Sequence, residues 1–288
     1  MLIINSNWKP YGFMVLGRLQ LQHNFLFSCF VAPASDKFDL IPIFSSSFFF
    51  PSLQRHVVEL NIMVHQITYT SNEIPQLCDR VHKDYLSKRK SDSQPRYLIS
   101  LAGVPGSGKT TFANAIAKRL STFAKVVVLS QDGFHLYRSE LTLMADPKEA
   151  FRRRGAPFTF NAQAFVNLIS KLKDRSQTIK APSFDHKLKD PIEDDIVIHG
   201  NVDIIIIEGN YVSLRDKYWD EIENFVDDTW FIKTPENLVR ERIIKRHLNA
   251  GIAANEKEAA ERADGSDMQN AHYIDGNSKP TKVLILSE

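Results

Sequence analysis

Residues 103–110 have the sequence Gly103-Val104-Pro105-Gly106-Ser107-Gly108-Lys109-Thr110, which fits the phosphate-binding loop pattern GxxxxGK[ST]. An apolar run at residues 98–102 precedes the loop and predicts a buried strand, while residues 111–117 continue as a helix. The pattern requires a strand before the loop and a helix after it. This context argues against the alternative, a glycine-rich turn that matches by chance.

Each specified position of the loop has a chemical purpose. Glycines let the backbone curl around a phosphate and turn its N–H groups inward. We expect Lys109 to reach the β- and γ-phosphates and Thr110 to offer a hydroxyl group to Mg²⁺, while the helix that continues at Thr111 favours an anion at its N-terminus. The loop therefore predicts a site for the phosphates of a nucleotide.

Composition limits the other kinds of function. The chain has 288 residues, enough for one large α/β domain or for one domain with an appendage. Its 36 Lys and Arg against 34 Asp and Glu give a net charge of +2, which makes no case for nucleic acid or a membrane as the main partner. The two cysteines, Cys29 and Cys78, form no metal-binding pattern, so we expect free thiols in a reducing compartment.

Residues 1–62 do not resemble the rest of the chain. They hold nine of the 19 phenylalanines without sustained periodicity, and they contain neither a membrane-spanning run nor a clean signal peptide. We expect a disordered extension or an artefact of the gene model, with translation starting at Met63 and a cytoplasmic protein. The alternative is a mitochondrial presequence, which the lack of acidic residues before Asp36 permits but the scarcity of arginine disfavours.

Residues 63–96 are predicted to form a helix and a linker. Apolar residues recur at helical spacing from Ile74 to Leu86, so this helix should pack on the domain that follows. The charged segment 88–95 is typical of a solvated linker. We assign residues 97–288 to the nucleotide-binding domain.

Two carboxylates follow predicted strands. Asp132 comes after a buried strand at 126–129, and Glu208 ends the run at 202–207, which predicts a central parallel strand covered on both faces. Because the carboxyl ends of parallel strands form the ligand-binding edge of such sheets, we expect both side chains there. Asp132 could instead be a turn residue before a glycine. For Glu208, the cost of burying an unpaired carboxylate favours a metal or polar ligand.

The segments between these strands hold weaker candidates. Three arginines end at Arg154 before a Gly-Ala-Pro break; most such runs are solvated faces, and an anion contact by Arg154 is the alternative. Residues 159–169 predict an amphipathic helix. A short strand at 178–182 precedes Asp185 and His186, which either line a substrate pocket or lie in an exposed polar loop.

The C-terminal part predicts a phosphate clamp. After a strand at 229–233, Arg242 and Arg246 are four residues apart on one helix, so both guanidinium groups face one side and can grip a polyphosphate. Exposed arginines paired with carboxylates or solvent are the alternative. Residues 247–267 are expected to form a mobile lid, and residues 282–286 a last strand.

The order of these segments resembles the phosphate-loop kinase family of uridine kinases, bacterial-type pantothenate kinases and phosphoribulokinases. The resemblance covers residues 74–288 and is closest to the uncharacterised or sugar-kinase-like branch of the family. It implies an α/β, three-layer P-loop NTPase fold with a mostly parallel central sheet and a helical lid. The segments that carry it are GVPGSGKTT (103–111), SQDGFH (130–135), RRRGAPFTFN (152–161), PSFDHKLKDP (182–191), IIIIEGNYV (204–212) and RERIIKRHL (240–248).

Carried over residue by residue, the resemblance implies ATP and Mg²⁺ as cofactors. Asp132 would be the general base that draws a proton from the acceptor hydroxyl. The resemblance assigns catalysis to Lys109, Asp132, Arg242 and Arg246, the metal to Thr110 and Glu208, and the substrate side to His135, Arg154, Asp185, His186, Glu208 and Tyr211. This division of roles comes from the resemblance and not from the residues alone.

One departure from the family affects the acceptor. The PxYDxxxHxR-type segment of true uridine kinases is here Pro-Ser-Phe-Asp-His-Lys at residues 182–187, with Phe in place of Tyr and the histidine shifted. The departure leaves the acceptor open. The resemblance as a whole implies transfer of the γ-phosphoryl group of ATP to a hydroxyl of a small metabolite that is nucleoside, pantothenate-like or sugar-like. The alternatives are a regulatory nucleotide-binding protein without turnover and a GTPase, which the absence of an NKxD segment disfavours. The sequence leaves a homodimer open.

Overall fold

The computed structural model describes residues 66–89 and 95–287, together with the backbone of four strands nearer the N-terminus. The chain divides into two compact units, Met1–Ile62 and Met63–Glu288. The four strands of the first unit form an antiparallel sheet in chain order: β1 (Ile4–Asn5), β2 (Met14–Gln20), β3 (Asn24–Phe30) and β4 (Ile41–Pro42). The predictions about the origin of residues 1–62, and about Cys29, lie outside what the structure describes.

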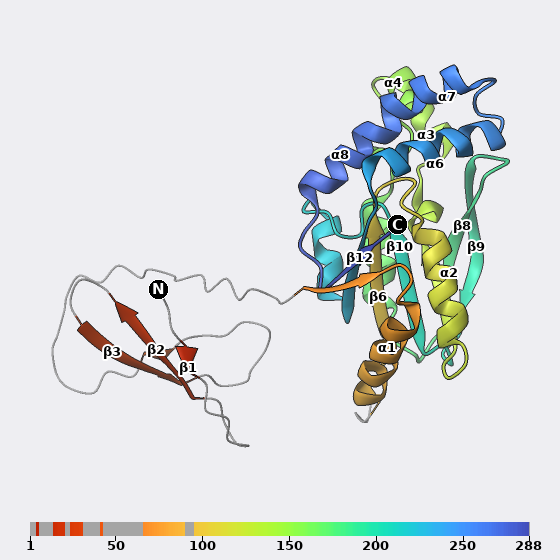
Figure 1. Cartoon of the computed structure of the whole chain (residues 1–288). Helices are drawn as coiled ribbons and strands as arrows, with labels where there is room; N and C mark the ends of the chain where they lie inside the picture. The colour runs from red at the N-terminus through yellow and green to blue at the C-terminus, as the bar shows by residue number, and fades with distance from the viewer. Residues whose placement is uncertain are drawn as a thin grey trace. The chain divides into compact units, whose positions relative to one another are not determined.

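A six-stranded sheet is the centre of the second unit (Figure 1). Its order is β5-β12-β11-β6-β10-β7, and every neighbouring pair is parallel. The strands are β5 (Ile67–Thr70), β6 (Tyr97–Gly103), β7 (Val126–Ser130), β10 (Ile204–Gly209), β11 (Asp228–Lys233) and β12 (Val283–Leu286). The predicted P-loop NTPase fold with its parallel sheet is confirmed.

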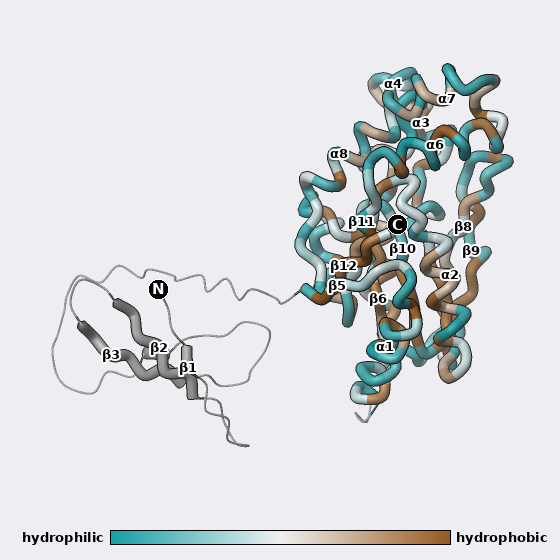
Figure 2. Tube along the Cα trace, viewed as in Figure 1, coloured by the Kyte–Doolittle hydropathy of each residue, from teal (hydrophilic) through white to brown (hydrophobic). Residues whose placement is uncertain are grey.

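Strand β10 shows why the sheet is covered on both faces. Its four isoleucines are fully buried, and they alternate between two hydrophobic clusters. Ile204 and Ile206 pack with helices α1 (Ile74–Lys88) and α2 (Lys109–Leu120), whereas Ile205 and Ile207 pack with α5 (Ala162–Lys171), α6 (Glu236–Asn249) and α8 (Met268–Asn277). Successive side chains of a strand point to opposite faces, so this run requires a layer of helices on each side. Figure 2 shows the hydrophobic segments concentrated in the sheet.

Two strand predictions need correction. Strand β7 is an edge strand that pairs with β10 alone, so Val126–Val128 are half-buried and not fully buried as we predicted. The strand predicted at 178–182 is longer and belongs to a separate antiparallel hairpin of β8 (Ile179–Asp185) and β9 (Asp190–Ile198). The sequence analysis did not identify β9 because its residues 193–195 are consecutive exposed acids that interrupt the apolar pattern.

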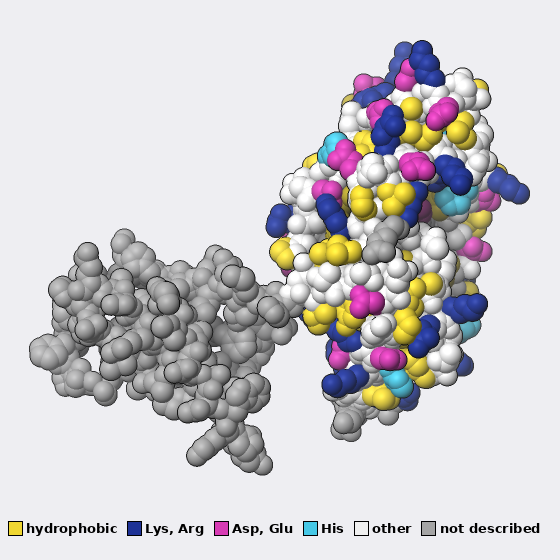
Figure 3. Space-filling view, in the orientation of Figure 1, with side chains coloured by type: hydrophobic (Ala, Val, Ile, Leu, Met, Phe, Trp, Pro, Cys, Tyr) yellow, Lys and Arg dark blue, Asp and Glu magenta, His cyan; other side chains and the backbone are white. Residues whose placement is uncertain are grey.

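Short helices complete the second unit. They are η1 (Gln131–Phe134), α3 (Arg138–Thr142), α4 (Pro147–Arg152), η2 (Pro157–Thr159), η3 (Trp219–Asn224), α7 (Glu256–Arg262) and the π-helical η4 (Ala263–Asp267). Lys and Arg side chains are interspersed with Asp and Glu on the face seen in Figure 3, as the near-neutral charge predicts. Among the helices of residues 66–89 and 95–287, none has the length and apolar character that a membrane span requires.

The hairpin touches η1 at Gly133. A Cβ atom added there would lie 2.1 Å from the carbonyl oxygen of Pro182, a backbone atom that cannot move without displacing β8. We predict that Gly133→Ala destabilises the fold by about 1–3 kcal/mol, the usual cost of overpacking, as measured by chemical denaturation. The control is Gly276→Ala in α8, where an added Cβ meets no atom within 4 Å and the helix should gain up to about 1 kcal/mol. Equal stability of the two variants would contradict this account.

Candidate functional site

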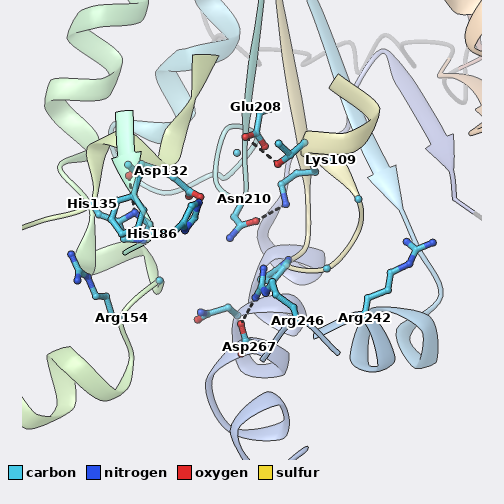
Figure 4. A pocket seen from close by; sticks show the side chains of 18 of the residues that line it. Lys109, Asp132, His135, Arg154, His186, Glu208, Asn210, Arg242, Arg246 and Asp267 are labelled. Carbon is cyan, nitrogen blue, oxygen red and sulfur yellow. Dashed lines mark hydrogen bonds and ion pairs between the residues drawn. The ribbon is translucent and has the colours of Figure 1, made fainter. Parts of the chain in front are cut away.

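The candidate site lies at the carboxyl ends of the parallel strands. The loop after β6, Asp132 after β7 and Glu208 in β10 come together there because parallel strands end at the same edge of the sheet. They border a cavity of ≈ 510 Å³. Its lining residues are Pro105, Gly106, Gly108, Lys109, Thr110, Thr111, Asp132, His135, Arg154, Gly155, Phe160, Phe184, His186, Glu208, Gly209, Asn210, Arg242, Arg246, Asp267 and Asn270 (Figure 4).

The glycines of the loop are required by its shape. Gly106 and Gly108 have φ values of +76° and +90°, which side chains disfavour. At Gly106 an added Cβ would also lie 2.9 Å from both Ile243 and the backbone oxygen of Val239. Gly108 is the N-cap of α2, and no side chain caps the helix, so its first N–H groups are available to an anion.

Lys109 lies under this loop with its ammonium group buried. Its Nζ donates to Asn210 Oδ1 at 2.7 Å and to the backbone oxygen of Val104 at 3.1 Å. Burial lowers the pKa of Lys109, while the carboxylates of Glu208 and Asp132 act in the opposite direction. The lysine is therefore held at the cavity wall by a neutral amide, with two carboxylates in its electrostatic field. The sequence analysis missed Asn210, although the EGNY segment placed it two residues after Glu208.

Thr110 and Glu208 meet beside Lys109. Thr110 Oγ1 donates to Glu208 Oε1 at 3.3 Å, and Glu208 is only 4% exposed. Burial raises the pKa of this carboxyl group, against the opposing effect of Lys109. Within the described residues no group of three or more His, Cys, Asp and Glu side chains could hold a metal ion by itself. One carboxylate and one hydroxyl, completed by phosphate oxygens and water, is a donor set that suits Mg²⁺.

On another side of the cavity lie Asp132 and two imidazoles, as Figure 4 shows. His135 Nδ1 is 2.8 Å from the backbone oxygen of Asp132, so this nitrogen is the donor and Nε2 of the neutral ring is an acceptor. Burial lowers the pKa of His135, which favours the neutral ring. The ring centroids of Phe160 and Phe184 lie 4.0 and 4.7 Å from that of His135, and His186 lines the same part. This side of the cavity therefore offers aromatic surface and polar groups together.

The predicted arginines differ in their surroundings. Arg242 and Arg246 both line the cavity, from the same side of α6. Arg242 Nη1 is 3.4 Å from the backbone oxygen of Ser107, inside the phosphate-binding loop. The terminal nitrogens of Arg154 instead contact the backbone oxygens of Lys189 and Leu136 and the carboxylate of Asp190. Arg154 thus joins the hairpin to the segment after η1 at the edge of the cavity.

Several predicted site residues lie outside the cavity lining. Asp185 is the last residue of β8, where it accepts from the backbone N–H groups of Lys187 and Leu188 in the hairpin turn. Tyr211 is fully buried and donates its hydroxyl to the backbone oxygen of Gly155. Three predicted residues of the phosphate-binding loop also lie outside the lining: Gly103, Val104 and Ser107. The lining residues that the sequence analysis did not name as site residues include Phe160, Phe184, Asn210, Asp267 and Asn270.

Comparisons with known proteins show which proteins this chain is similar to. A model of the "Phosphoribulokinase / Uridine kinase family" matches residues 98–257. The "ATP-dependent kinase-like protein notR'" of Aspergillus versicolor is 39% identical over 54% of this chain and 92% of that protein. "Putative uridine kinase C227.14" of Schizosaccharomyces pombe is 39% identical over 67% and 83%. A solved "putative fructose transport system kinase" from Silicibacter sp. TM1040 has a TM-score of 0.66 and 30% identity, over 73% of this chain and 98% of that one.

The segment that the family model matches contains the phosphate-binding loop, Asp132, Glu208 and both cavity arginines of α6. Two cavity residues of the C-terminal helices, Asp267 and Asn270, lie beyond it. The matched segment therefore spans the loop and carboxylate side of the cavity and ends before η4 and α8.

The raised pKa of Glu208 predicts a pH-dependent cost to stability. The folded chain holds the Glu208 proton more tightly than the unfolded chain, whose carboxyl has the ordinary pKa of 4.5. Stability is therefore lost as pH rises from about 4.5 through the raised value. We expect Glu208→Gln to raise Tm at pH 7, because the variant removes the buried charge that burial disfavours.

The difference between this variant and the wild type should shrink as pH falls from the raised pKa toward 4.5, and it should vanish below 4.5. Differential scanning calorimetry across this pH range measures it, with Glu221→Gln at an exposed position as the control that should change Tm little. A variant less stable than the wild type at pH 7, or a gain that persists in acid, would contradict the burial argument.

Proposed function

The chain belongs to the phosphoribulokinase/uridine kinase family and is a small-molecule kinase, and from this premise we propose that it transfers the γ-phosphoryl group of ATP to a hydroxyl group. The observation that carries the proposal is one cavity lined by a phosphate-binding loop, a carboxylate on the acceptor side and two arginines. Phosphoryl transfer needs positioning and charge neutralisation more than covalent chemistry, and this cavity supplies groups for both.

We assign the donor side to the loop and to Lys109, whose ammonium would exchange Asn210 for the β- and γ-phosphates. Arg242 and Arg246 would bind the phosphoryl oxygens from α6. Thr110 and Glu208 would hold Mg²⁺, which neutralises phosphate charge when bound.

Asp132 is proposed as the general base that takes the proton of the acceptor hydroxyl. It lines the cavity between the loop and the two histidines. His135, with Nε2 as an acceptor, would receive a hydrogen bond from a second hydroxyl of the substrate. Phe160 and Phe184 would pack against the carbon skeleton of the substrate.

The acceptor is proposed to be a small hydroxylated metabolite of the nucleoside, pantothenate-like or sugar-like kind. Two relatives have names that mention uridine and fructose, and each name describes that protein alone. In this chain the mixed aromatic and polar acceptor half suits a compound with an apolar face and several hydroxyl groups. We keep a regulatory protein without turnover as the alternative.

The direct test is incubation of the purified protein with Mg·ATP and a pool of nucleosides, sugars and vitamins, followed by mass spectrometry. We expect one class of compound to gain the mass of one phosphate. Asp132→Asn should keep ATP binding and lose about 10²–10⁴-fold in transfer rate, the contribution typical of a general base. Asp195→Asn, an exposed position on β9, should keep the full rate.

Unchanged turnover in Asp132→Asn would remove this residue as the base. A wild-type protein that binds Mg·ATP and phosphorylates nothing in the pool would favour the regulatory alternative.

A further inference from the structure

One carboxylate of the cavity has no role in the proposed transfer. Asp267 ends η4, the segment that returns the chain from α7 to α8, and it lines the cavity. Its Oδ1 accepts from Arg246 Nη2 at 3.2 Å, and Figure 4 shows this pair among the residues that line the cavity. A negative charge beside a phosphate-binding arginine opposes polyphosphate binding, so its presence there requires an explanation.

The other oxygen of the carboxylate anchors it. Asp267 Oδ2 lies 3.1 Å from Nε2 of His247, whose side chain is 4% exposed. Nδ1 of this histidine is buried and has no hydrogen-bond partner within the described part of the chain. The buried His247 ring therefore holds Asp267 Oδ2 by a contact that does not involve Arg246.

The contact with Arg246 is, by contrast, easily exchanged. The Arg246 side chain is 54% exposed and makes a single hydrogen bond to the carboxylate. An exposed ion pair of this kind is weak, typically about 0–1 kcal/mol, whereas an arginine with several phosphate oxygens makes more and stronger bonds. A phosphate in the cavity would therefore take Arg246 from Asp267 at little cost.

We propose that Asp267 is a positioning residue that occupies Arg246 until the phosphates of the nucleotide displace it. The carboxylate holds the guanidinium at the cavity wall when no nucleotide is bound and competes with the polyphosphate for it. This inference rests on the proposed function, because it takes Arg246 as a phosphate-binding residue.

A neighbouring ion pair provides the comparison. Arg240, on the same helix, donates to both oxygens of Asp264 in the same η4 segment, at 2.6 and 2.9 Å. Both side chains are about half exposed and neither lines the cavity. This pair joins η4 to α6 whether or not a nucleotide is present, so Asp264 should be neutral toward ATP.

The experiment is titration calorimetry of Mg·ATP with the full chain, its Asp267→Asn variant and its Asp264→Asn variant. Because Asp267→Asn removes the competing charge, this variant should bind Mg·ATP about two- to fivefold more tightly than the wild type, the range that an exposed ion pair allows. The gain should shrink at 0.5 M salt, since exposed charges are screened. Asp264→Asn should bind as the wild type does.

A double-mutant cycle separates this role from a structural one. In an Arg246→Gln background, Asp267→Asn should no longer improve binding, because the residue acts through that arginine. Asp267→Ser should behave as Asp267→Asn, which keeps the test valid if one variant fails to fold.

Different results would overturn the role of Asp267 and the proposed function. Unchanged or weaker Mg·ATP binding by Asp267→Asn, or a gain that persists without Arg246, overturns the inference alone. A wild-type protein that does not bind Mg·ATP overturns the proposed function itself.

Discussion

A buried ammonium group must have partners, and in this protein the need is met by three separate segments of the chain. Lys109 at the start of α2 has its hydrogen-bond partners in the loop before it and in Asn210, just beyond the end of β10. Two carboxylates, Glu208 and Asp132, offset part of the cost of burial. The parallel sheet brings these groups together because β6, β7 and β10 end at one edge. The site and the fold thus depend on the same arrangement of strands.

The charged side chains around the cavity differ in how far they are buried. Lys109 and Glu208 are buried, and each influences the pKa of the other. Arg246 is half exposed and pairs with a carboxylate from the returning η4 segment. Under the proposed function, the buried charges would bind the phosphates, and the exposed Arg246 would exchange partners as the nucleotide binds and leaves.

Much of the site followed from local sequence patterns. A few neighbouring residues are enough to predict the loop, the central strand with four isoleucines and the carboxylate at the end of that strand. The edge position of β7 could not be predicted, because an apolar run looks the same with one neighbouring strand or two. Asn210 and Asp267 were missed as site residues because single polar residues acquire a role only through the tertiary contacts around them. Arg154 was noticed by its charge, but its hydrogen bonds to Leu136 and Asp190 are properties of the fold.

The central claim is that nucleotide phosphates bind where the ammonium of Lys109 now contacts Asn210. The most direct measurement is the affinity of Lys109→Met for Mg·ATP at pH 7, with Lys118→Met on the exposed side of the same helix as the control. Hydrogen bonds to a charged group contribute about 1.5–3 kcal/mol, so the account predicts at least a roughly tenfold loss of affinity for Lys109→Met and no loss for Lys118→Met. Equal affinity in the two variants would contradict it.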